Sequence, residues 1–329
     1  MAIGLGLDVG GTKILACAVT DGGELVAETR VDSPRSPDLL LQTLVEGTDA
    51  LLSLLPDGPR AVVGVGVGVP SLVTSDGTLY ESPNLPALEG LPVHAAFAER
   101  LEVLSAATGG AGRWRLVIDN DGTCAVAGEF VFGAARGVTD VLLITLGTGI
   151  GGGVVAGGRL LRGARGFAGE VGHIVMDPAG PACHCGRRGC FEQLASGSAF
   201  ARIARRAAAA GAADRVLELA GGDVEAVRGE HVLEAARDGD RGALALFDEL
   251  AHNLAVGIAN LAEVLDPGVV LVGGGLASAG ELLIAPTVAD FAVEDRRGRG
   301  PHAVPIALAG LGARAGAFGA AALALGLVS

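Results

Sequence analysis

Residues 3–19 read IGLGLDVGGTKILACAV, two apolar runs joined by a Gly-Gly pair. The runs Ile3–Val9 and Ile14–Val19 predict two strands around a tight turn, since short apolar segments bounded by Gly pairs favour this arrangement. Backbone amides in the turn can approach phosphate oxygens because glycine has no side chain in the way. Asp8 can hold the magnesium ion that accompanies a nucleotide. The stretch therefore predicts a phosphate-binding hairpin, and the alternative is a purely structural one.

The same turn carries Lys13, the only lysine in a chain that otherwise uses arginine for positive charge. A general bias towards arginine could leave one lysine here by accident. The other interpretation is that the site needs a compact ammonium group, which a planar guanidinium replaces poorly.

Two more glycine-rich turns follow apolar runs. Val141–Leu146 leads into Gly147–Gly153 and a returning strand at Val154–Ala156, while Val269–Val272 leads into Gly273–Gly275. The first of these repeats the opening strand–turn–strand pattern more than a hundred residues later. A weak internal duplication of this kind predicts two related lobes.

The chain length also favours two domains, because 329 residues exceed the size at which a single hydrophobic core usually keeps growing. We predict an α/β fold with a smaller lobe at 1–120, completed by a C-terminal helix at 316–329, and a larger lobe at 121–315. The periodicity and the apolar runs predict further elements. These are helices at Leu39–Leu55, Ala199–Ala213, His231–Ala236, Ala243–Leu265 and Gly310–Leu327, and strands at Ala61–Val69 and Arg115–Ile118.

The formal net charge is −13 at pH 7, which argues against binding to nucleic acid or to an anionic membrane, since both need clustered basic residues. The N-terminus lacks a basic segment followed by a long apolar run, and no uninterrupted apolar run reaches about 18 residues. We expect a soluble cytoplasmic protein that acts on a small molecule.

Three of the five cysteines lie close together at Cys183, Cys185 and Cys190, ten residues or more after His173. Three thiolates and one imidazole close a tetrahedral coordination sphere, which is typical of a structural zinc ion. His184 is the competing imidazole, but His173 is preferred because both chain neighbours of His184 would already be ligands. Incidental cysteines are the alternative interpretation. Cys17 and Cys124 are expected to be small core residues.

The sequence DVGGTK, followed by TLGTGIGGG and VGGG, resembles the actin-like ATPase superfamily of sugar kinases over nearly the whole chain. The resemblance implies two ribonuclease-H-like lobes with an ATP and sugar cleft between them. It further implies that the first two turns bind phosphates and that the third lies near the nucleoside. The implied contacts are Gly10, Gly11, Thr12, Lys13, Thr148 and Gly149 for phosphates, Gly274 for the nucleoside and Asp8 for magnesium.

A second resemblance is more specific. Cys183–Glu192 matches C-x-C-G-x-x-G-C-x-E, and Glu170–His173 matches E-x-G-H, both signatures of the ROK family of repressors, open reading frames and kinases. The resemblance implies ATP-dependent phosphorylation of a hexose, with glucose expected first, and a homo-oligomer, either a dimer or a tetramer. In the family Glu170, His173 and Glu192 would bind sugar hydroxyls, and a carboxylate can accept two hydroxyls at once.

Asp119, Asn120 and Asp121 follow the predicted strand at Arg115–Ile118, where polar side chains usually face a binding site. They resemble the family's Asn-Asp motif, which implies that Asn120 binds the sugar and that Asp121 accepts the proton of the 6-hydroxyl. Asp119 is the alternative base, or a turn residue.

The sequence departs from the family pattern at two positions near the expected sugar pocket, where Thr123 replaces an asparagine and Ser71 replaces a glycine. These departures leave the identity of the sugar open. Asn84 matches a sugar-contacting position of glucokinase-like members. Alternative acceptors are N-acetylglucosamine, N-acetylmannosamine, fructose and allose, and polyphosphate is an alternative donor. A noncatalytic sugar sensor stays open. A DNA-binding repressor is disfavoured because Asp8 stands too near the N-terminus for a preceding winged-helix domain, and because the charge is negative.

Overall fold

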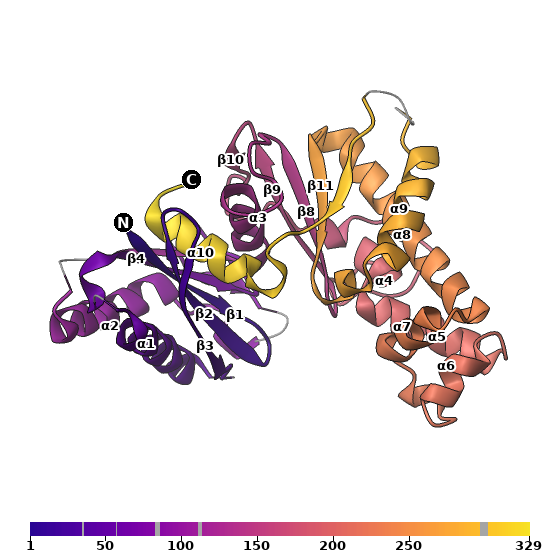
Figure 1. Cartoon of the computed structure of the whole chain (residues 1–329), viewed down its shortest axis with the longest axis horizontal. Helices are drawn as coiled ribbons and strands as arrows, with labels where there is room; N and C mark the ends of the chain where they lie inside the picture. Colours follow the sequence, from indigo (N-terminus) through magenta and orange to yellow (C-terminus); the bar gives the residue numbers. More distant parts are fainter. Residues whose placement is uncertain (35, 57, 83–85, 111–113, 297–301) are drawn as a thin grey trace. The chain divides into compact units, whose positions relative to one another are not determined.

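The computed structural model describes residues 1–34, 36–56, 58–82, 86–110, 114–296 and 302–329 (Figure 1). Their contacts form two compact units. The first contains residues 1–143, 152–169 and 309–329, and the second contains residues 144–151 and 170–308. By this measure residues 121–143 and 152–169 fall in the first unit, although we expected them in the second lobe. The lobe boundary at residue 120 stays a prediction.

A five-stranded sheet forms the centre of the first unit, in the order β3-β2-β1-β4-β7. The three strands β1, β2 and β3 are antiparallel neighbours, and β4 and β7 continue the sheet in parallel with β1. The structure confirms the predicted strands, although β3 was not predicted. Their bounds are β1 Ile3–Val9, β2 Lys13–Thr20, β3 Leu25–Asp32, β4 Val62–Val69 and β7 Arg115–Asn120.

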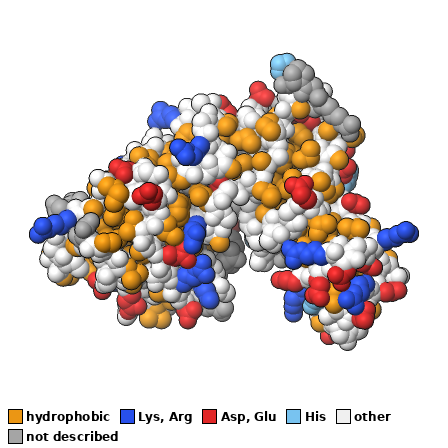
Figure 2. Space-filling model, in the orientation of Figure 1, with side chains coloured by type: hydrophobic (Ala, Val, Ile, Leu, Met, Phe, Trp, Pro, Cys, Tyr) orange, Lys and Arg blue, Asp and Glu red, His pale blue; other side chains and the backbone are white. Residues whose placement is uncertain are grey.

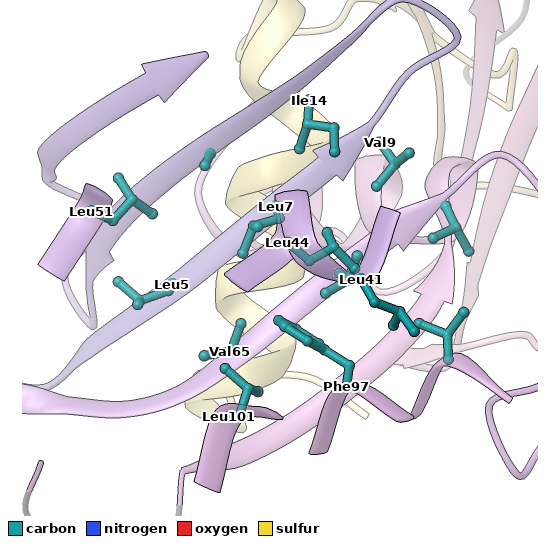
Figure 3. Packing of buried hydrophobic residues seen from close by; sticks show 14 of the residues in the cluster. Leu5, Leu7, Val9, Ile14, Leu41, Leu44, Leu51, Val65, Phe97 and Leu101 are labelled. Carbon is teal, nitrogen blue, oxygen red and sulfur yellow. The ribbon is translucent and has the colours of Figure 1, made fainter. Parts of the chain in front are cut away.

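Glycine alternates with bulky residues along β1 and β4, so the sheet has one bulky face and one flat face. Leu5 and Leu7 of β1 and Val65 of β4 pack against helices α1 (Pro37–Leu54) and α2 (Val93–Thr108), and Figure 3 shows this core. Side chains of successive strand residues point to opposite faces, which places the intervening glycines on the other side.

The flat face receives helix α10 (Ala315–Leu325), which the sequence predicted as a packing helix. A Cβ atom on Gly6 would lie 1.9 Å from the carbonyl oxygen of Ala317, and one on Gly66 would lie 1.9 Å from that of Ala320. No side chain fits these spaces, so the glycines of β1 and β4 allow the helix backbone to lie directly on the sheet. Helix α3 (Asp121–Val131) packs against α10 in the same way, since a Cβ on Gly319 would overlap α3.

A second five-stranded sheet has the order β10-β9-β8-β11-β12. With its strands numbered along the chain this is the same order as in the first sheet, which supports the internal duplication seen in the sequence. The glycine-rich run was predicted as one turn over Gly147–Gly153, and this was wrong. The turn ends at Gly149, and the remaining glycines belong to β9. The strands are β8 Val141–Leu146, β9 Ile150–Ala156, β10 Arg159–Leu160, β11 Val269–Gly273 and β12 Ile306–Leu308.

The remaining helices are mostly amphipathic and cover the second unit (Figure 1). Within the ranges given above, no helix is both long and apolar enough to span a membrane. On the face drawn in Figure 2, basic side chains lie next to acidic ones. The remaining bounds are α4 Phe191–Ala195, α5 Gly197–Ala209, α6 Asp214–Leu219, α7 Gly229–Arg237, α8 Arg241–Leu265 and α9 Glu281–Glu294, with a two-stranded sheet of β5 Leu72–Val73 and β6 Leu79–Glu81.

Candidate active site

Asp8 lies near the end of β1 and is half-buried. Its carboxylate lies against Gly316, where a side chain would not fit, because a Cβ there would lie 2.5 Å from its Cγ. The following turn is closed by Gly10, whose N–H donates to the carbonyl of Lys13 at 2.9 Å. Gly11, Thr12 and Lys13 are exposed, so the predicted phosphate contacts are accessible in this unit.

Asn120 and Asp121 form the junction between β7 and α3. Asn120 is the N-cap, and its Oδ1 accepts from the N–H of Thr123 at 3.1 Å, as expected of asparagine before a helix. Its Nδ2 donates to the carbonyl of Ser71 at 3.2 Å. Asp121 is the first helical residue, where a carboxylate is favoured by the helix dipole, and its Oδ1 accepts from the N–H of Gly122 at 2.8 Å.

Asp119 is engaged through both carboxylate oxygens. Its Oδ1 accepts from the N–H of Asn120 at 2.9 Å, and its Oδ2 accepts from Nε of Arg162 at 2.8 Å. Burial raises the pKa of Asp119, and the nearby Arg162 guanidinium opposes that rise. Arg162 was missed by the sequence interpretation, since it lies 43 residues from its partner within a glycine-rich loop that carries two arginines.

Two other carboxylates in this unit hold their protons unusually tightly. Burial raises the pKa of Asp121 to about 6, and hydrogen bonding to the N–H of Gly122 limits the rise. Burial and the charge of Asp121 raise the pKa of Asp8 to about 7. Perturbed carboxylates of this kind are typical of sites that take up protons or bind cations.

The cysteine cluster is brought together as predicted. Four residues each offer one ligand atom, and these atoms lie within 4.8 Å of one another. The residues are His173, Cys183, Cys185 and Cys190. The Sγ atom of Cys183 is 3.7 Å from Nδ1 of His173, and the Sγ atoms of Cys185 and Cys190 are 3.6 Å apart. Zinc–sulfur bonds of about 2.3 Å in a tetrahedron require edges of about 3.8 Å. The four residues therefore fit a tetrahedral zinc ion.

The thiols differ in their acidity. Burial raises the pKa of Cys185, but hydrogen bonds from Arg187 and from the other two thiols outweigh it and lower that pKa to about 7. Burial raises the pKa of Cys17 to about 12 and that of Cys124 well above its usual range. Both are fully buried core residues, as predicted.

The remaining carboxylates expected to bind sugar lie beside the cluster, in the second unit. Glu170 is 44% exposed in its side chain, and its Oε2 is 3.9 Å from Nε2 of His173. Glu192 is 12% exposed, and its Oε1 is 3.4 Å from Nδ1 of His184. His184 also forms, with His173 and Glu192, a second group whose ligand atoms lie within 4.8 Å. His184 therefore lies close to a carboxylate as well as to the thiols.

The other two glycine turns also lie in the second unit. Gly147, Thr148 and Gly149 connect β8 to β9, and Thr148 is exposed. Gly274 has φ 83°, a conformation that favours glycine, and a Cβ there would lie 2.5 Å from the carbonyl oxygen of Leu146. The third turn thus packs against the end of β8, immediately before the second turn.

Ser71, one of the two departures from the family pattern, is buried and its hydroxyl contacts that of buried Ser82. This pair was not predicted, because Ser71 precedes β5 and Ser82 follows β6, and only the pairing of these two strands brings them together. Thr123, the other departure, supplies the backbone N–H that Asn120 caps. Asn84 lies outside the described residues.

Comparisons with known proteins agree with this arrangement. Residues 4–326 match the model of the ROK family. The chain is 36% identical to the glucokinase of Streptomyces coelicolor over 98% of both chains, and 35% identical to the glucokinase of Thermotoga maritima over 86% of this chain and 84% of that protein. The crystal structure of a ROK family glucokinase from Streptomyces griseus, in complex with glucose and AMPPNP, superposes with a TM-score of 0.84 at 35% identity, covering 99% of this chain and 100% of that one.

The match spans almost all of the sequence, and both sheets share one strand order. The fold is therefore that of the actin-like ATPases, as the opening hairpin predicted. With its cysteine signature and E-x-G-H motif gathered into one cluster, the chain belongs to the ROK family.

Proposed function

We propose that this protein is a glucokinase, which transfers the γ-phosphoryl group of ATP to the 6-hydroxyl of glucose. The observation that carries the proposal is the division of roles between neighbouring carboxylates. Arg162 and the backbone N–H of Asn120 occupy both oxygens of Asp119, whereas Asp121 accepts from neutral donors, the N–H of Gly122 and the side chain of Asn120, and burial raises its pKa to about 6. The similarity to glucokinases supports glucose as the acceptor.

In the proposed reaction the Asp121 carboxylate accepts the proton of the sugar hydroxyl while that oxygen attacks the γ-phosphorus. The bond from the γ-phosphorus to the bridging oxygen breaks, and ADP leaves with the electron pair. Asp121 then releases its proton to solvent. A base with a pKa near 6 is ionised at neutral pH and still accepts a proton effectively.

Asn120 supports the sugar in this scheme, because its amide is held at two points. Its oxygen caps α3, its Nδ2 donates to the carbonyl of Ser71, and its side chain also hydrogen-bonds Asp121, so the amide has a fixed orientation beside the proposed base. We propose that Glu170, Glu192 and His173 bind the other hydroxyls.

Asp8 fits a magnesium ion. It is a hard oxygen ligand whose own pKa is raised by burial and by a second carboxylate, so a divalent cation would relieve an unfavourable negative charge. When bound, magnesium supplies positive charge next to the phosphates. Two turns would bind the phosphate oxygens: the exposed turn of Gly10, Gly11, Thr12 and Lys13, and the turn of Thr148 and Gly149. Gly274 would lie near the nucleoside.

The cysteine cluster fits a structural zinc ion, because its donors are three thiols and one imidazole and their spacing suits a tetrahedron. Its members are His173, Cys183, Cys185 and Cys190. When bound, zinc supplies a rigid centre for the loop. Because Nδ1 of His173 faces the thiols, a bound zinc ion would fix the direction of its imidazole ring beside Glu170.

A coupled assay with purified protein tests the proposed function. We expect glucose to be phosphorylated with ATP more efficiently than N-acetylglucosamine, N-acetylmannosamine, fructose or allose, and ATP to be preferred over polyphosphate. Turnover of none of these sugars with either donor would contradict the proposed function.

A further inference from the structure

The side chain of Glu192 contacts the turn between β8 and β9, in addition to lying among the expected sugar ligands. Its Oε2 accepts from the backbone N–H of Ile150 at 3.1 Å. A Cβ atom on Gly149 would lie only 2.1 Å from the same oxygen. Glycine is therefore needed at this position for the carboxylate to lie against the turn.

The segment that follows Glu192 holds the same turn through its backbone. The N–H of Gly197 donates to the carbonyl of Gly147 at 2.8 Å, and the N–H of Ser198 donates to that of Thr148 at 3.3 Å. The two carbonyls thus point towards the start of α5, while the N–H of Ile150 points to Glu192. Opposite ends of the turn are fixed by one stretch of seven residues, Glu192–Ser198.

The two oxygens of Glu192 have separate partners. Oε2 is used by Ile150, whereas Oε1 lies 3.4 Å from Nδ1 of His184. Only Oε1 is available to accept from a sugar hydroxyl without breaking the contact with the turn. The carboxylate is 12% exposed, and a hydrogen bond to a charged, largely buried acceptor is stronger than a neutral one.

We propose that Glu192 is a positioning residue for the phosphate-binding turn of Thr148 and Gly149, in addition to binding the sugar. This inference rests on the proposed function, which assigns phosphates to that turn. One carboxylate then links the shape of the phosphate-binding turn to the sugar site, and nucleotide affinity depends on Glu192 even when no sugar is present.

Three substitutions separate the two roles. Glu192→Gln keeps an oxygen that accepts from Ile150, so the side-chain nitrogen must take the place of Oε1 and offers the sugar a donor instead of an acceptor. Glu192→Asp keeps the charge but shortens the side chain by one methylene, which withdraws the carboxylate from the turn. Glu192→Ala removes both contacts.

Glu170→Ala is the matched control. Glu170 is a second carboxylate expected to bind sugar, it is more exposed than Glu192, and its nearest imidazole is that of His173 rather than His184. A change that only weakens sugar binding should behave like this variant.

The measurement is calorimetric titration of each variant with Mg-ADP without sugar, together with the Michaelis constant for glucose. We expect Glu192→Asp and Glu192→Ala to weaken Mg-ADP binding about tenfold, the scale of one lost charge-assisted hydrogen bond. Glu192→Gln and Glu170→Ala should bind Mg-ADP as the wild type does, while both raise the Michaelis constant for glucose.

Wild-type affinity for Mg-ADP in Glu192→Asp would overturn the inference, as would an equal loss in Glu170→Ala. A thermal melt of each variant identifies any that fails to fold, and if Glu192→Ala does so, the contrast between the Asp and Gln variants decides. The proposed function fails separately, if the wild type does not phosphorylate glucose.

Discussion

At the scale of single residues, three carboxylates at the ends of β1 and β7 differ because their partners differ. Asp119 is paired with Arg162, Asp121 accepts from the N–H of Gly122 and the side chain of Asn120, and Asp8 lies against Gly316, where a Cβ would overlap its carboxylate. This difference supports the proposal that Asp121 accepts the proton and that Asp119 has a structural role.

We predict that Asp121→Ala lowers the turnover number for glucose at least about a hundredfold, the usual scale for loss of a general base, while glucose binding weakens far less. Asp119→Ala serves as the control, since it removes the partner of Arg162 but not the base. Steady-state kinetics and glucose titrations provide both quantities. A larger loss of turnover in Asp119→Ala would assign the base to Asp119 instead.

Asp8 should reduce the stability of the magnesium-free protein at high pH. Its folded pKa of about 7 lies above the ordinary aspartate value of 3.8, so its contribution to stability is fully present below the unfolded pKa. That contribution is lost as the pH rises through 7. Asp8→Asn cannot ionise and should be more stable than the wild type at pH 8, by about 1–3 kcal/mol, but equally stable at pH 4. Thermal melts at both values provide the comparison. A gain that is larger at pH 4 would contradict the assigned pKa.

At the scale of elements, the flat face of the first sheet depends on its glycines. Gly66→Ala would place a Cβ 1.9 Å from the carbonyl oxygen of Ala320 in α10, so the helix must move away from the sheet. We predict a loss of about 3 kcal/mol, at the upper end for overpacking. Gly275→Ala is the control because nothing lies within 4 Å of its Cβ position. Denaturant unfolding measures both, and equal stabilities would contradict the close packing of α10.

The loop that carries the cysteine cluster allows a second prediction for a structural element. Cys185→Ala takes one ligand from the proposed zinc site, so we expect lower zinc content and a sharply raised Michaelis constant for glucose, because His173 loses its fixed orientation. Cys17→Ala, in the core, should retain zinc. Metal analysis beside kinetics tests the link, and a zinc-free variant with unchanged glucose affinity would refute it.

Three of the elements that the sequence did not predict, α3, α9 and β3, have identifiable reasons. Helix α3 is buried over most of its length, so it lacks the polar face whose 3.6-residue period reveals a helix. Helix α9 contains Pro286, which usually signals a helix end. Strand β3 is only partly buried on either face. The hairpins, by contrast, were predictable because their glycine turns and apolar runs are local.

Across the whole molecule, contacts between residues that are distant in the sequence could not be predicted. Arg162 and Asp119 are 43 positions apart, Glu192 and Ile150 42, and Asn120 and Ser71 49. The cluster of His173 with three cysteines was predictable because those cysteines span only eight residues. The contact partners of Asp119 and Asp121 depend on the order of strands, which no local pattern encodes.

The duplicated strand order gives each sheet its own glycine hairpin, consistent with a molecule that binds a nucleotide through repeated turns. A homo-oligomer, either a dimer or a tetramer, stays a prediction, and sedimentation velocity would establish it.

Transfer of the γ-phosphoryl group of ATP to the 6-hydroxyl of glucose can be followed directly by phosphorus NMR of a mixture of the wild-type protein, glucose and Mg-ATP. We expect glucose 6-phosphate and ADP in equal amounts. Free phosphate in place of a sugar phosphate, phosphorylation at another hydroxyl, or unchanged ATP would contradict this expectation.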